Sequence, residues 1–381
     1  MAFSTVTGSD GITSLVGTTG TDVAVIVDLS DDVFIGGNTG DDVVDIDLFG
    51  ESRVAKDYAV RMGGGNDELE SFDPILDSFI SLDGEVLAND GNDRFDANEV
   101  INSEVVGRGG NDVIDIDFLS SSLVNGNTGN DIIEIDFAAG SAIFGGQGVD
   151  TIQIFNNSND VEINGNRGSD SIFVGAVDFG SSEIFGGQGD DSIEVFSGDD
   201  QFVSGDLGAD FILTNGGDDA VEGGDGNDEL ITRGGNDTLE GGAGNDILEG
   251  GADADVMSGG SGDDLFEILF GDSVVAAGKS SGYDRITDFN VSDDEIFTST
   301  LVTTIFDRGT VSSLGGSLSA DLSAFVGFPG FTNAATITIT GAVDWAGSYV
   351  IVDDNFSTLY DANDTVFQIN TVAGLTTANF I

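Results

Sequence analysis

Residues 205–267 read GDLGADFIL, TNGGDDAVE, GGDGNDELI, TRGGNDTLE, GGAGNDILE, GGADADVMS and GGSGDDLFE, seven units of nine residues in unbroken register. Each unit combines a glycine-rich turn, an aspartate at its sixth position and an apolar residue at its eighth. One turn and one short strand cannot bury an apolar residue alone, so such units must stack on one another. Glycine also disfavours helix, by about 1 kcal/mol per residue relative to alanine. The stretch therefore predicts a parallel β-helix with two units, or 18 residues, in each coil.

The same turn recurs through the N-terminal half at about twice the nine-residue period. After five of the turn aspartates, at positions 42, 112, 131, 150 and 191, the residues at +2 and +4 are apolar and the residue between them is polar, as in Ile114, Asp115 and Ile116. This period of two predicts a strand with one face in the core. The aspartates are Asp22, Asp42, Asp67, Asp93, Asp112, Asp131, Asp150, Asp170 and Asp191, at intervals of 19 to 26 residues.

These patterns define the fold that we expect. It is all-β, a right-handed parallel β-helix (β-roll) solenoid of about thirteen coils with a C-terminal β capping domain. Residues 1–204 would form degenerate coils of 19–26 residues, 205–267 the regular nonapeptide β-roll, and 268–381 the cap and secretion-signal region. The longest intervals, within 43–93, predict loops that bulge from the coils.

Composition narrows the possible functions. The 381 residues include 70 acidic and 10 basic side chains, for a net charge of −60, with no histidine and no cysteine. Serine–histidine–aspartate triads, histidine-ligated metals and disulfides are therefore excluded. The acidic field argues against nucleic acid, and no apolar run approaches the roughly 18 residues of a membrane span. The charge points instead to bound cations that offset it.

The turns supply the oxygens that a hard cation needs. Glycine at positions 1, 2 and 4 tolerates a positive φ, so successive carbonyls can face a common space beside the sixth-position carboxylate. Two stacked turns offer roughly six oxygens, which suits Ca²⁺ better than the tighter octahedron of Mg²⁺. Turns on the opposite side carry Ser122, Ser141 and Ser182, whose neutral hydroxyls predict no bound cation.

The repeat resembles the GGxGxDxUx nonapeptide of RTX proteins, the hemolysin-type calcium-binding family. The resemblance implies several Ca²⁺ ions between neighbouring turns, held by aspartates and turn carbonyls. The implied aspartates are Asp42, Asp67, Asp93, Asp112, Asp131, Asp150, Asp170, Asp191, Asp210, Asp219, Asp228, Asp237, Asp246, Asp255 and Asp264. The implied glycines are Gly187, Gly189, Gly224, Gly226, Gly242, Gly244, Gly260 and Gly262.

The C-terminal region departs from the repeat. GYDRITDFNVSDDEI at 282–296 resembles the element that follows RTX arrays, and we expect Ile286–Phe297 to lie across the last coil as a cap. Residues 347–381 resemble the tail of exported cyanobacterial RTX proteins, which implies one-step type I secretion. The N-terminal stretch MAFSTVTGSDGITSLVG has no basic start and no apolar run, which argues against a cleaved secretory signal.

Three functions are compatible with these features. The leading one is a non-catalytic, calcium-folded extracellular protein of the cell surface or matrix, self-assembling as an S-layer or filament. A second is a β-helix polysaccharide lyase or epimerase, for which the loops at 50–62 and 71–90 would hold the site. A third is an adhesin for glycan or ice, although the exposed positions are acidic and form no threonine ladder.

Overall fold

The computed structural model describes residues 91–156, 159–175, 182–269 and 283–298 without interruption. It also describes shorter segments, and for those before residue 66 and at 70–71, 75–76, 79–81, 305–312 and 334–340 it gives the backbone alone. These segments are 4–7, 13–16, 23–26, 33–36, 43–46, 55–56, 59–61, 66–71, 75–76, 79–81, 305–312, 334–340, 347–352, 365–370 and 374–381. The chain divides into two compact units, Met1–Ser197 and Gly198–Ile381.

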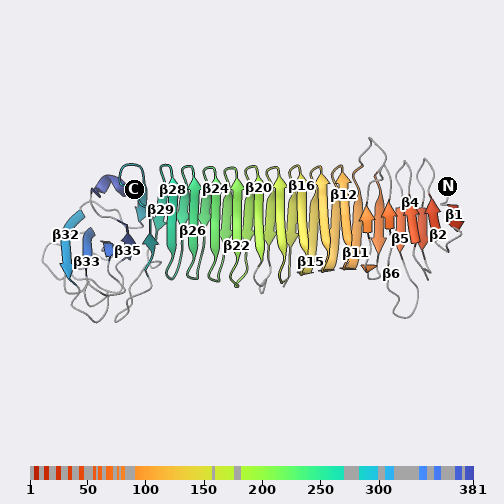
Figure 1. Ribbon diagram of the computed structural model, residues 1–381, viewed down its shortest axis with the longest axis horizontal. Coiled ribbons are helices and arrows are strands. Elements are labelled where there is room, and N and C mark those ends of the chain that lie inside the picture. The colour runs from red at the N-terminus through yellow and green to blue at the C-terminus, as the bar shows by residue number, and fades with distance from the viewer. Residues whose placement is uncertain are drawn as a thin grey trace. The chain divides into compact units, whose positions relative to one another are not determined.

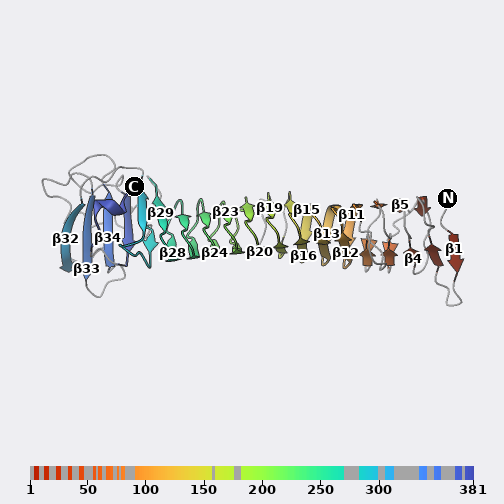
Figure 2. The same cartoon turned by 90° about the horizontal axis from the view of Figure 1, so that it is seen from above.

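In the first unit, successive strands alternate between two parallel sheets, A and B (Figures 1 and 2). Sheet A contains β2 (Thr13–Val16), β4 (Val33–Gly36), β7 (Ala59–Arg61), β10 (Phe79–Ser81), β12 (Glu104–Gly109), β14 (Leu123–Thr128), β16 (Ala142–Gln147), β18 (Glu162–Arg167) and β20 (Glu183–Gln188), and β1 (Ser4–Thr7) pairs with β2 antiparallel. Sheet B contains β3 (Val23–Ile26), β5 (Val43–Ile46), β8 (Glu68–Ser71), β11 (Arg94–Ile101), β13 (Val113–Ser120), β15 (Ile132–Ala139), β17 (Thr151–Ile154), β19 (Ser171–Val174) and β21 (Ser192–Val195). β9 (Ile75–Leu76) also pairs with β11, and β6 (Ala55–Lys56) pairs with β9.

The second unit repeats this arrangement with shorter coils. Its sheet A contains β22 (Phe202–Leu207), β24 (Ala220–Asp225), β26 (Thr238–Ala243), β28 (Val256–Ser261) and β30 (Arg285–Ile286). Its sheet B contains β23 (Phe211–Thr214), β25 (Glu229–Ile231), β27 (Ile247–Glu249), β29 (Leu265–Ile268) and β31 (Glu295–Thr298).

The core consists of apolar side chains stacked one coil above another. In the first unit Ile114, Ile133 and Ile152 form one such row, and all three are fully buried. In the second unit Leu230 and Leu248 stack in the same way. Buried and half-exposed residues alternate along each strand, which is the period of two seen in the sequence. Because the strands pair parallel and in register, the same alternation repeats in every coil.

The segment after the repeat forms one further coil. β30 and β31 pair parallel with β28 and β29, and the connection between them places the Phe289 ring 6.1 Å from that of Phe266. We expected Ile286–Phe297 to lie across the end of the solenoid. Its two ends instead join the sheets, because Ile286 and Ile296 occupy the same inward positions as the repeat residues.

The C-terminal strands extend sheet A of the second unit. β35 (Thr365–Ile369) pairs with β30, followed by β34 (Gly347–Val352), β33 (Ala334–Thr340) and β32 (Ile305–Ser312). Buried Tyr283 and Tyr349 meet edge to face, with their hydroxyl oxygens 3.2 Å apart. A 3₁₀ turn, η1 (Thr377–Asn379), precedes Phe380, which bridges to Ile296.

The predicted fold class is confirmed. The strands from β2 to β31 form a parallel β-helix, whereas β33, β34 and β35 pair antiparallel. The 3₁₀ turn η1 is the one helical element that the described residues contain. About nine turns are present in full, against thirteen expected over 1–267, because much of residues 1–65 and 72–90 lies outside the described residues. Within the described part, no helix has the length and apolar character needed to span a membrane.

Two adjacent glycines test how tightly the coils stack. Gly235 has a φ of 137°, and a Cβ there would overlap the carbonyl oxygen of Gly217 in the preceding coil. Its neighbour Gly234 has no heavy atom within 4 Å of the corresponding point. Position 4 of the turn therefore requires glycine both for its backbone conformation and for the contact between coils.

We predict that Gly235→Ala destabilises the calcium-loaded protein by at least about 1–3 kcal/mol, the cost of a non-glycine residue held in such a conformation. Gly234→Ala, the matched control, should change stability by about 0.5 kcal/mol or less. Urea unfolding in saturating calcium measures both. Equal effects of the two substitutions would contradict the close stacking of the turns.

Candidate metal centres

The sixth-position aspartates form ladders at the corners of the coils. Every one that the structure describes is at most 3% exposed. The Oδ1 atom of Asp131 accepts a hydrogen bond from the backbone N–H of Asp112 at 2.8 Å, and Oδ1 of Asp150 accepts one from Asp131 at 2.8 Å. In the second unit Oδ1 of Asp246 accepts from Asp228 at 2.9 Å. One carboxylate oxygen thus links each coil to the coil before it.

In six of these aspartates the second carboxylate oxygen has no hydrogen-bond donor. These Oδ2 atoms are buried, and they belong to Asp131, Asp150, Asp170, Asp228, Asp246 and Asp255. A Cβ placed on Gly223 would lie 2.5 Å from Oδ2 of Asp228 and 2.5 Å from the carbonyl oxygen of Gly241. A carboxylate oxygen and a carbonyl of the next coil therefore converge beside a glycine. Two acceptors in this arrangement fit a cation.

The electrostatics of the corners agree with this interpretation. Burial raises the pKa of Asp131 and Asp246 to about 6 and that of Asp170 to about 7. For Asp255, burial and the nearby charge of Asp284 raise the pKa to about 8. The ionised form is disfavoured because the corner desolvates it. A bound divalent cation would reverse this penalty.

The second unit has an aspartate ladder at both corners. The opposite corner contains Asp219, Asp237 and Asp255, where Oδ1 of Asp237 accepts from the N–H of Asp219 at 2.8 Å and Oδ1 of Asp255 accepts from Asp237 at 2.9 Å. Asp284 and Asp294 continue the two ladders beyond the repeat, accepting from the N–H groups of Asp255 and Asp264 at 3.1 and 3.2 Å. Aspartates therefore occupy the corners through the last coil.

In the first unit the opposite corner contains serines. The Oγ of Ser122 accepts from the N–H of Ser103 at 3.0 Å, and the Oγ of Ser141 accepts from Ser122 at 3.1 Å. Each hydroxyl also donates within its own coil, from Ser122 to the carbonyl of Ser120 at 2.7 Å. Serine thus makes the same link between coils as aspartate. It brings no negative charge and no unpartnered oxygen, so this corner is complete without a cation.

Sequence reasoning missed two features of the corners. Fifth-position asparagines form an exposed ladder, in which Oδ1 of Asn92 accepts from the N–H of Asn111 at 2.7 Å. Asp288, outside the repeat, accepts from the N–H groups of Gly259 and Gly260 at 3.1 and 2.8 Å. The recurring Gly-Asn-Asp triplets are the signal that points to the asparagine ladder, whereas no repeat motif includes Asp288.

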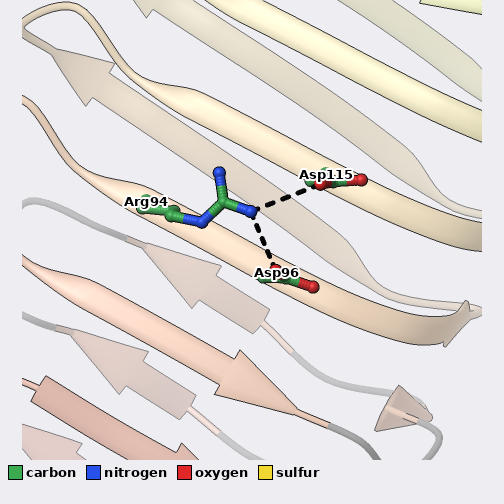
Figure 3. Close-up of polar contacts among 3 residues, drawn as sticks. All are labelled: Arg94, Asp96 and Asp115. Atoms are coloured by element: carbon green, nitrogen blue, oxygen red, sulfur yellow. Dashed lines mark hydrogen bonds and ion pairs between the residues drawn. The ribbon is translucent and has the colours of Figure 1, made fainter.

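The outward carboxylates lie on a different surface. Asp96, Asp115 and Glu134 stand in one row on sheet B of the first unit. Arg94 Nη2 lies 2.8 Å from Asp96 Oδ2 and 3.3 Å from Asp115 Oδ2 (Figure 3). Burial and the charge of Asp96 raise the pKa of Asp115. This row is half-exposed and is paired with a guanidinium. It differs in both respects from the sixth-position aspartates, which are buried.

Most of the predicted ligand residues lie together at these corners. The predicted glycines occupy positions 2 and 4 of the turns with φ between 95° and 150°. Asp42 lies outside the described residues. Within the part of the chain that the structure describes, no three carboxylates gather as a metal cluster. A cation at a corner would therefore combine few carboxylates with backbone carbonyls.

A family model matches this part of the chain. The RTX calcium-binding nonapeptide repeat is found at residues 177–206, 197–230 and 231–266. These residues are RTX calcium-binding nonapeptide repeats. The RTX repeats bind several Ca²⁺ ions. A comparison with the curated proteins finds no match.

Two solved structures are similar to the chain. One is a hyperactive, Ca²⁺-dependent, β-helical antifreeze protein from an Antarctic bacterium, 25% identical over 72% of this chain and 86% of that chain, with a TM-score of 0.42. The other is the AlgE6R3 subunit of the Azotobacter vinelandii mannuronan C5-epimerase, 20% identical over 51% of this chain and 80% of that chain, with a TM-score of 0.18. The scores are low, so the fold assignment rests on the strand pairing of the chain itself.

A conservative substitution at Asp246 distinguishes the effect of the hydrogen bond between coils from the effect of ion binding. Asp246→Asn keeps the Oδ1 acceptor and replaces the unpartnered oxygen with an amide, so we predict that fewer Ca²⁺ ions are retained at a limiting calcium concentration. Ser141→Ala, the control, should lose about 1 kcal/mol of stability with the ion count unchanged. Equilibrium dialysis with elemental analysis measures the ions. An unchanged count for Asp246→Asn would contradict ligation by this ladder.

The raised pKa values predict how pH acts on the calcium-free chain. Unfolded aspartate titrates near 3.9, whereas these aspartates titrate at about 6 to 8 when folded. Between those values the folded state binds more protons, so its stability falls as pH rises from about 4 to 8. Circular dichroism of the calcium-stripped chain should show more β structure at pH 4.5 than at pH 8. A gain of structure with rising pH would refute this.

Proposed function

We propose that the protein is a calcium-folded extracellular component of the cell surface or matrix, without catalytic activity. The observation that carries the proposal is the set of buried Oδ2 atoms without donors at the corners. With a net charge of −60, the chain needs many cations to become compact. Extracellular calcium modules typically bind at about 10⁻⁴–10⁻³ M. Such sites fill outside the cell and stay empty in the cytosol.

We assign the ions to pairs of stacked aspartate turns. Each would be held by a sixth-position carboxylate, such as that of Asp228 or Asp246, together with turn carbonyls that include those of Gly224 and Gly242. The serine corners of the first unit would take none, because their hydrogen bonds are complete. The assignment gives the second unit two rows of ions and the first unit one.

A non-catalytic role is supported by the distribution of titratable groups. The carboxylates with clearly raised pKa values, such as Asp170 and Asp255, are spaced one coil apart along the ladders. General acid–base catalysis requires such groups to converge on one substrate. Regular spacing along a solenoid suits repeated cation binding better than a single reaction centre.

Self-assembly is supported by the outer face of sheet B in the first unit. Phe118 and Phe137 are adjacent in register and 38% and 41% exposed. On the same strands, Asp115 and Glu134 form part of the half-exposed carboxylate row. Calcium could bridge such rows on two copies while the rings pack together, giving a lateral contact between solenoids. This contact would produce an ordered sheet or filament of the S-layer type.

Assembly is tested by electron microscopy of the purified protein. We expect ordered sheets or filaments in millimolar calcium and none in chelator, since calcium both folds the chain and bridges the copies. Phe137→Ser should abolish the ordered arrays while leaving the calcium-induced β spectrum unchanged. Phe173→Ser, a substitution on a neighbouring part of the same sheet, serves as the control. Isolated particles at all calcium and protein concentrations would overturn the structural role.

Export is proposed to depend on the C-terminal region. β34 and β35 belong to the sheet that begins at the last coil, so truncation at residue 347 would also damage the fold. A fusion avoids this problem. A reporter protein followed by residues 268–381 should appear in the medium of cells that export the full chain by type I secretion. Retention of that fusion, with normal export of the full chain, would contradict the proposal.

A further inference from the structure

A groove of about 440 Å³ lies on the outer surface of sheet A in the first unit, over β14, β16, β18 and β20. Gly146 forms its floor, because it stands in register between Asn127 and Asn166 and has no side chain of its own. The lining residues are Asn125, Asn127, Phe144, Gly146, Gln147, Asn166, Arg167 and Gln188.

The charge of this groove is opposite to that of the chain. Arg167 is the one charged residue of its lining, in a protein with 70 acidic and 10 basic side chains. The guanidinium Nε donates to Oε1 of Gln188 at 3.2 Å, which orients the head group. Arg167 forms no ion pair with any residue that the structure describes. Its remaining N–H groups are thus available for an anion.

The amide of Asn125 in the lining and that of Asn164, which lies in register with Phe144, are also held in place. Oδ1 of Asn125 accepts from the N–H of Asn127 at 2.9 Å, and Oδ1 of Asn164 accepts from the N–H of Asn166 at 2.7 Å. These bonds fix two backbone turns with φ near 73°. Phe144 is half-buried in the register row of Asn125 and Asn164, so its ring offers an apolar surface between two amides.

We propose that this groove binds a carboxylate-bearing saccharide. Arginine binds carboxylates through paired, charge-assisted hydrogen bonds. Asparagine and glutamine amides both donate to and accept from hydroxyls, and an aromatic ring packs against the apolar face of a sugar. Successive rows recur at about 4.8 Å, so an extended chain can cross several coils. An inorganic anion would use the guanidinium and leave the ring and the amides without a role.

The test uses the full chain in saturating calcium with two matched probes, trigalacturonate and its methyl ester, which lacks the carboxylate charge. Isothermal titration calorimetry should give tighter binding of the acid. Arg167→Gln should weaken the acid by about tenfold and leave the ester unchanged, since one charge-assisted hydrogen-bond pair is lost. Phe144→Ala should weaken both probes, because the ring contact is independent of charge.

Arg233→Gln is the control, since it removes one exposed positive charge from the second unit and changes net charge equally. It should bind both probes as the parent does, and every variant should keep the calcium-induced β spectrum. Binding of trigalacturonate that Arg167→Gln does not weaken would overturn the proposal, as would binding of sulfate as tight as that of trigalacturonate. Absence of heat with the acid at millimolar concentration would also overturn it. None of these three outcomes bears on calcium folding or assembly.

Discussion

A buried carboxylate oxygen without a hydrogen-bond donor is the constraint on which this fold depends. Asp131, Asp228 and Asp246 each use one oxygen to link two coils and leave the other facing a carbonyl of the next coil. Backbone groups cannot supply the missing positive charge, because each turn presents carbonyls to this space. A hydrogen-bond donor could satisfy one such oxygen, whereas a divalent cation satisfies a carboxylate and several carbonyls together. The stacking of the coils and the binding of calcium are therefore two aspects of one arrangement.

The two kinds of corner show how the chain adjusts its dependence on cations. Ser122 and Ser141 link the coils of the first unit with a hydroxyl that accepts from one coil and donates within its own. A coil with serine on one side brings one buried carboxylate to its two corners, whereas a coil with aspartate on both sides brings two. At the last coil, Asp294 receives an N–H from Asn290 on its second oxygen at 2.7 Å, so protein donors complete that carboxylate. Corner residues thus differ, from coil to coil, in the negative charge that they bring.

Much of this arrangement was predictable from the sequence, and the reasons are specific. The spacing of Asp246 and Leu248 recurs in every nonad, so one unit defines the turn, the buried aspartate and the inward residue of all the others. The ladder itself was not predictable, because residues 18 to 26 apart in sequence meet only through the coil length. Asp288 has no counterpart in the repeat, and its contacts with Gly259 and Gly260 depend on where the last coil ends. The groove around Arg167 depends on four aligned coils, and no short motif encodes it.

The most direct test of the calcium-dependent fold is hydrogen exchange of the full chain at pH 7.5, with calcium and with chelator. The account predicts that the amide of Asp228, which donates to the carboxylate of Asp246, is protected in calcium and exchanges at the rate of an unfolded chain in chelator. The same loss should occur throughout residues 205–267, and magnesium at equal concentration should not restore protection. Full protection of these amides in chelator would contradict the account, because the ladder would then be stable without a cation.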